Sequence, residues 1–326
     1  MNVKLSPLGL GGAQLGNLYQ AIDDDTAAAT VRRAWDEGIR YFDTAPHYGL
    51  GLSERRLGAA LASYPRDEYV LSTKVGRVLE PHAAAPGERD DQGFDVPATY
   101  RRRWDFSRDG VLRSLEDSLA RLGLDRVDIV YVHDPDDHFT EAVTGAFPAL
   151  LQLRDQGVVG AVGAGMNQTP MLTEFVRRFD LDHVLMAGRY TLLNQPALDD
   201  LLPLCLDRGV GVVAGGVFNA GILATAEPGA IYDYAAAPAE LVEKARRIAE
   251  ICARHGVELP EAALALPASH PAVVSVVVGA HDAGQVAVNA RRAAKVVPAV
   301  VWTDLVDAGL LRADAVGRPV TSGGPQ

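Results

Sequence analysis

Short apolar runs alternate with amphipathic segments along almost the whole chain. Six runs are rich in β-branched residues: YVLSTKVG from Tyr69, VDIVYVHD from Val127, VVGAVGAG from Val158, HVLMAGRY from His183, VGVVAGGV from Val210 and VVSVVVGA from Val273. Continuous rather than alternating apolar runs are typical of parallel strands covered on both faces. With Leu8–Gly11 and Tyr41–Thr44 as the first two, the pattern predicts eight strands.

The segments between these runs have helical spacing and recognisable ends. One carries leucines at 112, 115, 119 and 122, follows Ser107 as a predicted N-cap, and stops at Gly123. Two further apolar stripes end at Gly209 and Gly256. The strand–helix unit recurs about every 30 residues, which predicts an α/β fold with a single (β/α)8 barrel. A doubly wound open sheet is the alternative.

Two polar segments interrupt this repeat. Residues 79–106 follow the third predicted strand, and residues 219–237 follow the seventh. Both leave the carboxyl end of a strand, where barrel active sites are built, and Trp104 favours a lid in the first. We expect residues 1–311 to form the barrel and residues 312–326 a flexible tail. The opening stretch NVKLSPLGLGG could also form a short hairpin that plugs the barrel bottom.

The composition narrows the class of protein. The 326 residues are 48% hydrophobic and carry a net charge of -11, which argues against disorder and disfavours nucleic-acid or anionic-membrane partners. No signal peptide is recognisable, and no run approaches the length of about 18 apolar residues that a membrane span needs. Cys205 and Cys252 are expected to be packing residues in a reducing compartment. We therefore expect a cytoplasmic enzyme with a small-molecule substrate; its oligomeric state is left open.

Three stretches resemble binding motifs by their letters alone. GVGVVA at 209–214 matches a dinucleotide fingerprint, but its glycines follow a helix and lead into a strand, which reverses the geometry. GLGGAQLG at 9–16 fails at the third glycine position. HDPDDH at 133–138 suggests a metal, but it lacks a further His or Cys partner. We expect neither a Rossmann domain nor a metal site.

Four polar side chains lie at or just after the ends of three consecutive predicted strands. Asp43 ends the second strand, and Tyr48 follows five residues later. Lys74 ends the third strand and His133 ends the fourth. Each alone has an ordinary explanation, such as a lysine that reaches the surface. Neighbouring strands of a barrel bring all four to one mouth.

The chemistry of these four groups is complementary. A tyrosine has a reference pKa of about 10 and is a poor base at neutral pH. A neighbouring ammonium favours the phenolate, and a carboxylate holds the ammonium in place. A histidine beside the phenol can orient a carbonyl or hydroxyl by hydrogen bonding. The set suits proton transfer at a carbinol carbon coupled to hydride transfer.

Taken together, these motifs resemble the aldo-keto reductase superfamily. The resemblance runs from LGLGGAQLG to QVAVN and rests on DTAPHYGLGLSERRLG, LSTKVGR, the SRDGVLRSLEDSLARLGLDRVDIVYVHD run and VVVGAHDAGQVAVN. It implies a (β/α)8 barrel that binds a nicotinamide dinucleotide without a Rossmann domain. It also implies a catalytic tetrad, with Tyr48 as general acid/base, Lys74 and Asp43 as its tuners, and His133 as the substrate orienter.

The resemblance further implies a set of cofactor contacts at strand ends and in the turn after the last strand. These are Gly12, Ala13, Asn167, Gly215, Phe218, Asn219, Gly279, His281, Gln285 and Asn289. The chain departs from the family pattern at Ala187, where a glutamine is common, and at Gly215, where an aromatic stacks on nicotinamide. The last turn carries Asp282 and no cation, so we expect NAD to be preferred, with NADP as the alternative.

Three further motifs resemble one branch of this superfamily: HDPDDH, GAGMNQ and GGVFNAGIL. Members of that branch, which includes aldose 1-dehydrogenases and pyridoxal dehydrogenases, oxidise cyclic hemiacetals to lactones. The expected substrate is L-fucose or a related D-threo-aldose or galactose-type sugar, with His47, Trp104, Asp134 and His138 as substrate contacts. Pyridoxal is the second candidate and a general aldehyde reductase the third. A cofactor-sensing subunit without turnover is the remote alternative.

Overall fold

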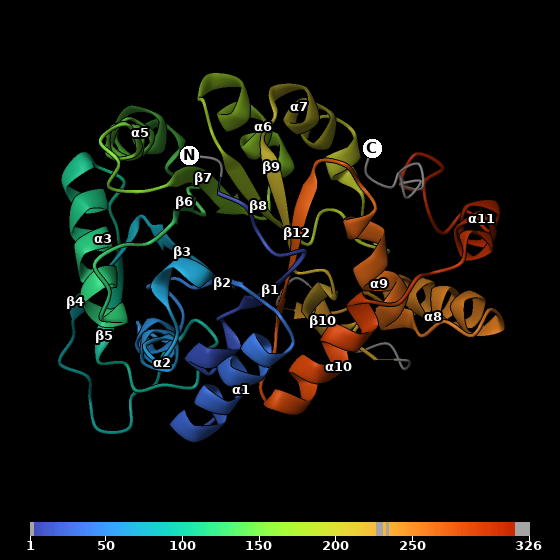
Figure 1. The fold of residues 1–326 in the computed structure, drawn as a ribbon, viewed down its shortest axis with the longest axis horizontal. Coiled ribbons are helices and arrows are strands. Elements are labelled where there is room, and N and C mark those ends of the chain that lie inside the picture. Colours follow the sequence, from blue (N-terminus) through green and yellow to red (C-terminus); the bar gives the residue numbers. More distant parts are fainter. Residues whose placement is uncertain (1–2, 226–230, 233–234, 317–326) are drawn as a thin grey trace.

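The computed structural model describes residues 3–225, 231–232 and 235–316. In this part of the chain, eight parallel strands close into a barrel (Figure 1). Around the barrel they are β1 (Leu8–Gly11), β2 (Tyr41–Asp43), β3 (Val70–Val75), β6 (Ile129–His133), β7 (Ala161–Met166), β8 (His183–Ala187), β9 (Gly211–Gly215) and β12 (Val273–Gly279). The barrel closes where Leu8 pairs with Val276. The predicted (β/α)8 barrel is confirmed, and the doubly wound alternative is wrong.

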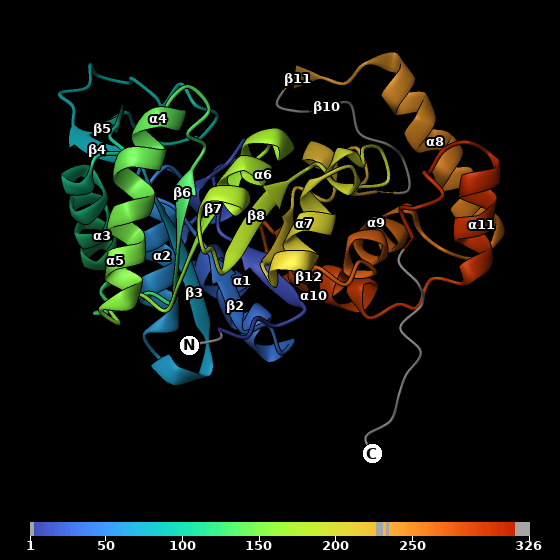
Figure 2. The ribbon, with the colours of Figure 1, turned by 90° about the horizontal axis from the view of Figure 1, so that it is seen from above.

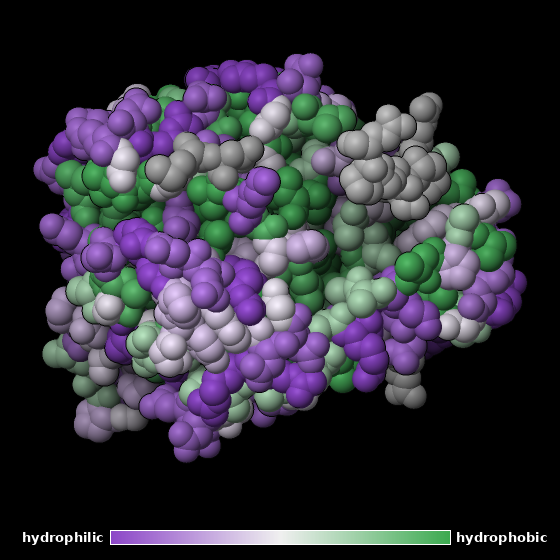
Figure 3. All heavy atoms as spheres, in the orientation of Figure 1, coloured by the Kyte–Doolittle hydropathy of each residue, from purple (hydrophilic) through white to green (hydrophobic). Residues whose placement is uncertain are grey.

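Helices surround this barrel (Figures 1 and 2). They are α1 (Asp24–Asp36), α2 (Leu52–Leu61), α3 (Arg108–Leu122), α4 (Phe139–Glu141), α5 (Phe147–Asp155), α6 (Thr169–Arg178), α7 (Leu201–Arg208), α8 (Ala239–Arg254), α9 (Leu259–Ala268), α10 (Ala283–Ala293) and α11 (Ala299–Asp307). On the face shown in Figure 3, hydrophilic residues cover the outer side of α1. The opposite side of α1 buries Ala27, Val31 and Ala34, because its apolar residues recur at helical spacing.

The predicted boundaries of α3 are confirmed. The hydroxyl of Ser107 accepts a hydrogen bond from the backbone N–H of Gly110 (3.1 Å), which satisfies one of the free donors at the helix start. Gly123 ends the helix with a φ of 66°, in the left-handed region that favours glycine. Helix α3 packs on β3 and β4, and so supports β3, the strand that carries Lys74.

The polar segment 79–106 is an ordered flap. Its ends pair as an antiparallel hairpin of β4 (Arg77–Pro81) and β5 (Tyr100–Trp104). Between them, Phe94 and Val96 are buried in a small apolar cluster with Leu50 and Leu79. The second predicted loop, 219–237, contains β10 (Ile231–Tyr232) paired with β11 (Ala235–Ala236). Residues 226–230 and 233–234 of that prediction lie outside the described residues.

Both ends of the described chain pack against the barrel. Residues 3–7 form no hairpin; Val3 and Leu5 instead pack on the lower barrel interior, so the hairpin interpretation is wrong for these residues. At the other end, Ala315 is buried, and its carbonyl accepts a hydrogen bond from Tyr190 Oη (2.5 Å). The packed part of the chain therefore extends past residue 311. Residues 317–326 of the predicted tail lie outside the described residues.

The two cysteines are buried in the layer between the barrel and its helices. Burial raises the pKa of the Cys205 thiol to about 12 and that of Cys252 to about 11. Such thiols are unreactive at neutral pH, which fits the predicted packing role. Within the described ranges, no helix has both the length and the apolar character to cross a membrane.

Candidate active site

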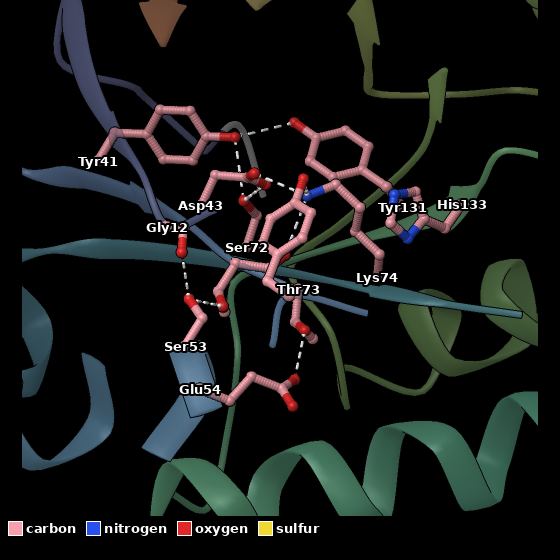
Figure 4. A network of polar contacts seen from close by, with 12 residues as sticks. Gly12, Tyr41, Asp43, Ser53, Glu54, Ser72, Thr73, Lys74, Tyr131 and His133 are labelled. Carbon is pink, nitrogen blue, oxygen red and sulfur yellow. Dashed lines mark hydrogen bonds and ion pairs between the residues drawn. The ribbon is translucent and has the colours of Figure 1, made fainter. Parts of the chain in front are cut away.

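The centre of the site is a lysine with three hydrogen-bond acceptors (Figure 4). Lys74, near the end of β3, is 2% exposed. Its Nζ lies 2.7 Å from Asp43 Oδ2, at the end of β2, and donates to the Thr44 carbonyl and to Tyr48 Oη, each at 3.0 Å. An ammonium group has three N–H donors, so every donor is used and the direction of the side chain is fixed.

The lysine stays charged in spite of its burial. Burial by itself lowers the pKa of Lys74, but the charge of Asp43 and the hydrogen bonds to Asp43 and Tyr48 reverse this effect and raise the pKa above its usual range. A buried ammonium is tolerated because a carboxylate faces it at hydrogen-bonding distance. The phenol oxygen of Tyr48 is thus held against a permanent positive charge.

His133 ends β6 beside the phenol. Its ring stands edge-on to the ring of Tyr48, with centroids 6.0 Å apart and an interplanar angle of 90°. Burial, together with the positive charges of Arg77 and Lys74, lowers the pKa of His133 well below its usual range. Its Nδ1 is buried and has no partner among the described residues, while Nε2 lies 3.4 Å from Asp134 Oδ2. The ring is therefore a neutral imidazole, which can accept or donate a hydrogen bond.

The predicted substrate contacts form one connected surface around His133. His47 packs edge-to-face on His133, with ring centroids 5.7 Å apart. Asp134 forms an ion pair with Arg77, whose guanidinium lies 4.4 Å from the ring centroid of Trp104.

The same surface continues through the indole of Trp104, which is 42% exposed and lies beside His138, with ring centroids 5.5 Å apart. All four residues that the sequence suggested are brought together here.

Two arginines complete this surface, and sequence reasoning missed both. Arg77 comes from the LSTKVGR motif, three residues after Lys74, and Asp134 and Trp104 hold it. Arg102 comes from the flap; it pairs with Asp90 and donates through Nη2 to the His47 carbonyl (2.9 Å). The position of Arg77 in that motif could have indicated it. Nothing in the sequence could have indicated Arg102, because its role depends on how the flap folds back.

The first predicted cofactor contacts, Gly12 and Ala13, lie just past β1. The N–H of Gly12 donates to the Asp43 carbonyl (2.7 Å), and Ser53 Oγ donates to the Gly12 carbonyl (2.6 Å). A Cβ on Gly12 would lie 2.6 Å from Ser53 Oγ, so glycine is needed for this close approach. Ala13 is the N-cap of a short helix, Gln14–Gly16. This corner holds the backbone of Asp43 in place.

A second group of predicted cofactor contacts follows β7 and β9. Asn219 is 3% exposed, and neither its Oδ1 nor its Nδ2 has a hydrogen-bond partner among the described residues. Phe218 packs on the apolar cluster of β9 and β12, and Gly215 is buried at the end of β9. The carbonyl of Asn167 accepts from Arg189 Nε (2.6 Å). A buried amide after β9 that has no partner among the described residues fits a ligand rich in polar groups, such as a dinucleotide.

The last group lies in the turn from β12 to α10. The Asp282 carboxylate caps α10 by accepting from the Gln285 N–H (2.8 Å), and Gln285 Oε1 accepts from the His281 N–H (2.9 Å). A Cβ on Gly279 would lie 1.8 Å from Gln14 Oε1, and Asn289 is buried in the second turn of the helix. Asp282 is the one charged residue between positions 279 and 290.

The stretch HDPDDH does not assemble a metal centre in the described part of the chain, where no three His, Cys, Asp or Glu residues converge. His133 faces Tyr48, Asp134 pairs with Arg77, and Asp136 accepts a hydrogen bond from Gln168. Each of these residues therefore makes its own contact at the barrel mouth, and the motif does not act as one unit.

This geometry agrees with a family match. Residues 7–308 match the Aldo/keto reductase family. The chain belongs to the aldo/keto reductase family. Members of this family use NAD(P)H, and the chain is accordingly an oxidoreductase. The resemblance seen in the sequence motifs is confirmed.

Relatives of this aldo/keto reductase give a finer comparison. The chain is 49% identical over 309 residues to a D-threo-aldose 1-dehydrogenase of Pseudomonas sp, covering 93% of this chain and 94% of that protein. It is 39% identical over 325 residues to a pyridoxal 4-dehydrogenase of Microbacterium luteolum, covering 94% and 95%. The structure resembles that of a glycerol dehydrogenase of Gluconobacter oxydans with a TM-score of 0.75 at 23% identity, covering 100% and 97% of the two chains. This last likeness concerns the fold.

Proposed function

We propose that this aldo/keto reductase oxidises the C1 hydroxyl of a cyclic hemiacetal sugar to a lactone, by hydride transfer to a nicotinamide dinucleotide. The substrate is L-fucose or a related D-threo-aldose or galactose-type sugar. The observation that carries the proposal is the contact of Tyr48 Oη with Lys74 Nζ at 3.0 Å, with Asp43 holding the ammonium from the other side. This arrangement favours the phenolate form that a base at C1–OH needs.

In this mechanism, Tyr48 is the general base. Its phenolate takes the proton of the anomeric hydroxyl as the C1–H electron pair leaves as hydride and the C1–O bond becomes a carbonyl. Lys74 stabilises the phenolate before transfer, and Asp43 keeps the ammonium in position. The neutral His133 forms a hydrogen bond to the reacting oxygen and orients it. The nicotinamide ring of a bound dinucleotide supplies the hydride acceptor.

The segments that follow β7 and β9 belong to the proposed cofactor surface. Asn219, whose two amide atoms have no partner among the described residues, is the strongest contact; Phe218 precedes it after β9, and Asn167 follows β7. These contacts would hold the dinucleotide in both oxidation and reduction of the substrate. Gly12, by contrast, acts through the backbone of Asp43.

The substrate proposal is supported by the relatives and by the polarity of the mouth. The relative at 49% identity is a D-threo-aldose 1-dehydrogenase. One contiguous surface offers both hydrogen-bond donors and acceptors, from Asp134, Arg77, His47 and His133. A sugar ring presents several hydroxyls, each of which can donate and accept.

A screen of aldoses tests this proposal. Purified protein is mixed with L-fucose, galactose-type sugars or pyridoxal, each with NAD or NADP, and absorbance of the reduced nicotinamide is followed. We expect turnover of L-fucose or a close stereochemical relative, and a loss of at least about a hundredfold in Tyr48→Phe. Turnover that persists in Tyr48→Phe would contradict the mechanism, and turnover of pyridoxal alone would support the second candidate.

That second candidate is oxidation of pyridoxal to its lactone. It is favoured by the relative at 39% identity, a pyridoxal 4-dehydrogenase, and by the half-exposed indole of Trp104, on which a planar ring can stack. Trp104→Ala distinguishes the two substrates, because an aromatic substrate loses its stacking surface and a sugar retains its hydrogen bonds.

The proposal includes a preference for NAD over NADP. Asp282 would repel a 2′-phosphate, and positions 279–290 contain no Lys or Arg. Asp282→Asn provides the test, because asparagine also caps helices while carrying no charge. We expect kcat/KM for NADP to rise several-fold in this variant and kcat/KM for NAD to stay within about twofold. A parent enzyme at least about tenfold better with NADP would refute the preference.

A further inference from the structure

Three hydroxyl groups lie directly beneath the tetrad, inside the barrel. Tyr41, Ser72 and Tyr131 are each 0% exposed. Each stands two positions before Asp43, Lys74 and His133 on its own strand, so each points to the same face of the strand as its partner, one layer lower. Barrel interiors are commonly filled by aliphatic side chains. Three hydroxyls in this layer therefore need a reason.

The hydroxyls form one chain that ends on Asp43 (Figure 4). Ser72 Oγ donates to Asp43 Oδ1 at 2.7 Å, Tyr41 Oη lies 3.0 Å from Ser72 Oγ, and Tyr131 Oη lies 3.3 Å from Tyr41 Oη. Each hydroxyl has a single proton. Because Ser72 gives its proton to the carboxylate, Tyr41 must donate to Ser72, and Tyr131 must then donate to Tyr41.

The direction of this chain is fixed at working pH. Burial raises the pKa of both Tyr41 and Tyr131 above the usual range of a phenol, so both remain protonated. The O–H dipoles then all point their positive ends toward Asp43. Hydrogen bonds aligned in this way strengthen one another in a low-dielectric interior.

Neighbouring strands leave space for both rings. A Cβ on Gly9, in β1, would lie 2.7 Å from the Tyr41 ring. A Cβ on Gly163, in β7, would lie 2.9 Å from the Tyr131 ring and 2.0 Å from a backbone oxygen. Each tyrosine therefore occupies room that a glycine on the adjacent strand provides. The layer is built around the two phenols.

We infer that Ser72, Tyr41 and Tyr131 are positioning residues for the proposed site, which act through Asp43 and Lys74 to ease deprotonation of Tyr48. The inference rests on the proposed function. Asp43 has two oxygens: Oδ2 faces Lys74 and Oδ1 faces Ser72. The hydroxyl chain satisfies Oδ1 and so fixes the orientation of the carboxylate. With that orientation fixed, Oδ2 holds the ammonium against Tyr48 Oη.

Titration of Tyr48 in single variants tests this inference. The protein is labelled with [13Cζ]tyrosine, and the Tyr48 signal is identified by its absence in Tyr48→Phe. We expect Ser72→Ala to move the Tyr48 titration upward by about half to one pH unit. Tyr41→Phe should move it less and Tyr131→Phe least, because each is one link further from Asp43. The pH profile of kcat for oxidation should shift in the same order, with KM for the sugar little changed.

Two controls remove comparable hydrogen bonds elsewhere. Tyr190→Phe loses a buried phenol that donates to the Ala315 carbonyl, and Ser275→Ala loses a buried hydroxyl that donates to the Ser6 carbonyl. Both can lower stability, but neither should move the titration of Tyr48. Unshifted titration in Ser72→Ala and Tyr41→Phe, or an equal shift in the controls, would overturn the inference.

The titration needs no substrate. If no sugar is turned over, the proposed substrate fails, while the titration still decides on the positioning residues. Tyr41→Phe keeps the ring and its packing, so this variant decides the inference if Ser72→Ala does not fold.

Discussion

Histidines held neutral by burial are a shared feature of the barrel interior. His133 and His47 lie at the mouth, and His183 begins β8 at the opposite end. Burial lowers the pKa of all three, and in His183 the nearby Asp182 opposes the effect only in part. For His133 the consequence is functional, because only a neutral ring can exchange donor and acceptor roles with a substrate. For all three the consequence for stability is the same.

That consequence is acid sensitivity. In the unfolded chain a histidine takes up a proton near pH 6.5, whereas a buried ring with a lowered pKa does so only at a lower pH. A folded pKa below the unfolded one adds stability that is present above about pH 6.5 and lost as the pH falls below it. Each ring thus makes unfolding easier as the pH falls, by at most about 1.4 kcal/mol per pH unit.

His183→Gln tests this effect without touching the mouth. We expect the slope of unfolding free energy against pH, between about pH 6 and 5, to fall, by at most about 1.4 kcal/mol per unit. Urea unfolding at several pH values gives the slope, which does not depend on any constant loss of stability in the variant. A slope equal to that of the parent would mean that His183 is protonated in the folded barrel.

At the scale of elements, a buried carboxylate joins α2, β3 and α3 behind the tetrad. Glu54 on α2 is fully buried. Thr73 on β3 donates to its Oε1 (2.8 Å), and Arg121 near the end of α3 donates through Nε to its Oε2 (2.6 Å). Thr73 precedes Lys74 and points to the outer face of the strand. The network thus fixes the strand from outside while Asp43 holds Lys74 from inside.

Removing Arg121 should be costly for this reason. Arg121→Met leaves Glu54 buried without its charged partner, and we expect the free energy of unfolding to fall by about 3 kcal/mol or more. Arg126→Ala is the matched control, since its pair with Asp67 is exposed and contributes at most about 1 kcal/mol. Denaturant unfolding of both variants gives the comparison. Equal losses would show that Glu54 does not depend on Arg121.

Period-two alternation explains what could be predicted about the site and what could not. Asp43, Lys74 and His133 were recognisable because polar residues after apolar runs stand out in the sequence. Tyr41 and Tyr131 lie on the same strand faces as Asp43 and His133. A tyrosine is common in a buried apolar strand, so the sequence did not indicate the hydroxyl chain. Period-two alternation predicts that Ser72 and Lys74 lie on the same face of β3. It does not predict the hydrogen bond from Ser72 to Asp43, which also depends on how β2 and β3 are aligned. Register is a property of the folded sheet.

At the scale of the whole molecule, the barrel was predictable because the repeat is carried by every strand and helix. The arrangement of the barrel mouth was less predictable, because its contacts join segments that are far apart in the chain. The Leu18–Phe94 bridge and the hydrogen bond from Arg102 to His47 link the flap to two other loops, and no periodic pattern encodes such contacts. The predicted cofactor residues likewise lie at or after the ends of strands from both ends of the chain, from β1 to β12.

Because these strands close the barrel, cofactor binding should stabilise the whole fold. A ligand that binds only the folded state adds about 2.7 kcal/mol at a hundred times its Kd. We expect the midpoint of thermal unfolding to rise with NAD concentration. Asn219→Gly should weaken this rise while leaving the free protein as stable or more so. The variant removes two buried atoms without partners among the described residues, and glycine tolerates the φ of 46°.

The comparison separates a ligand contact from a structural one. A residue kept for packing would lower the midpoint of the free protein when replaced, and the stabilisation by NAD would be unchanged. Thr30→Ala serves as the control, because this buried residue lies inside α1, among the helices that surround the barrel. An Asn219→Gly variant that loses stability without NAD, yet gains as much from NAD as the parent, would remove Asn219 from the proposed cofactor surface.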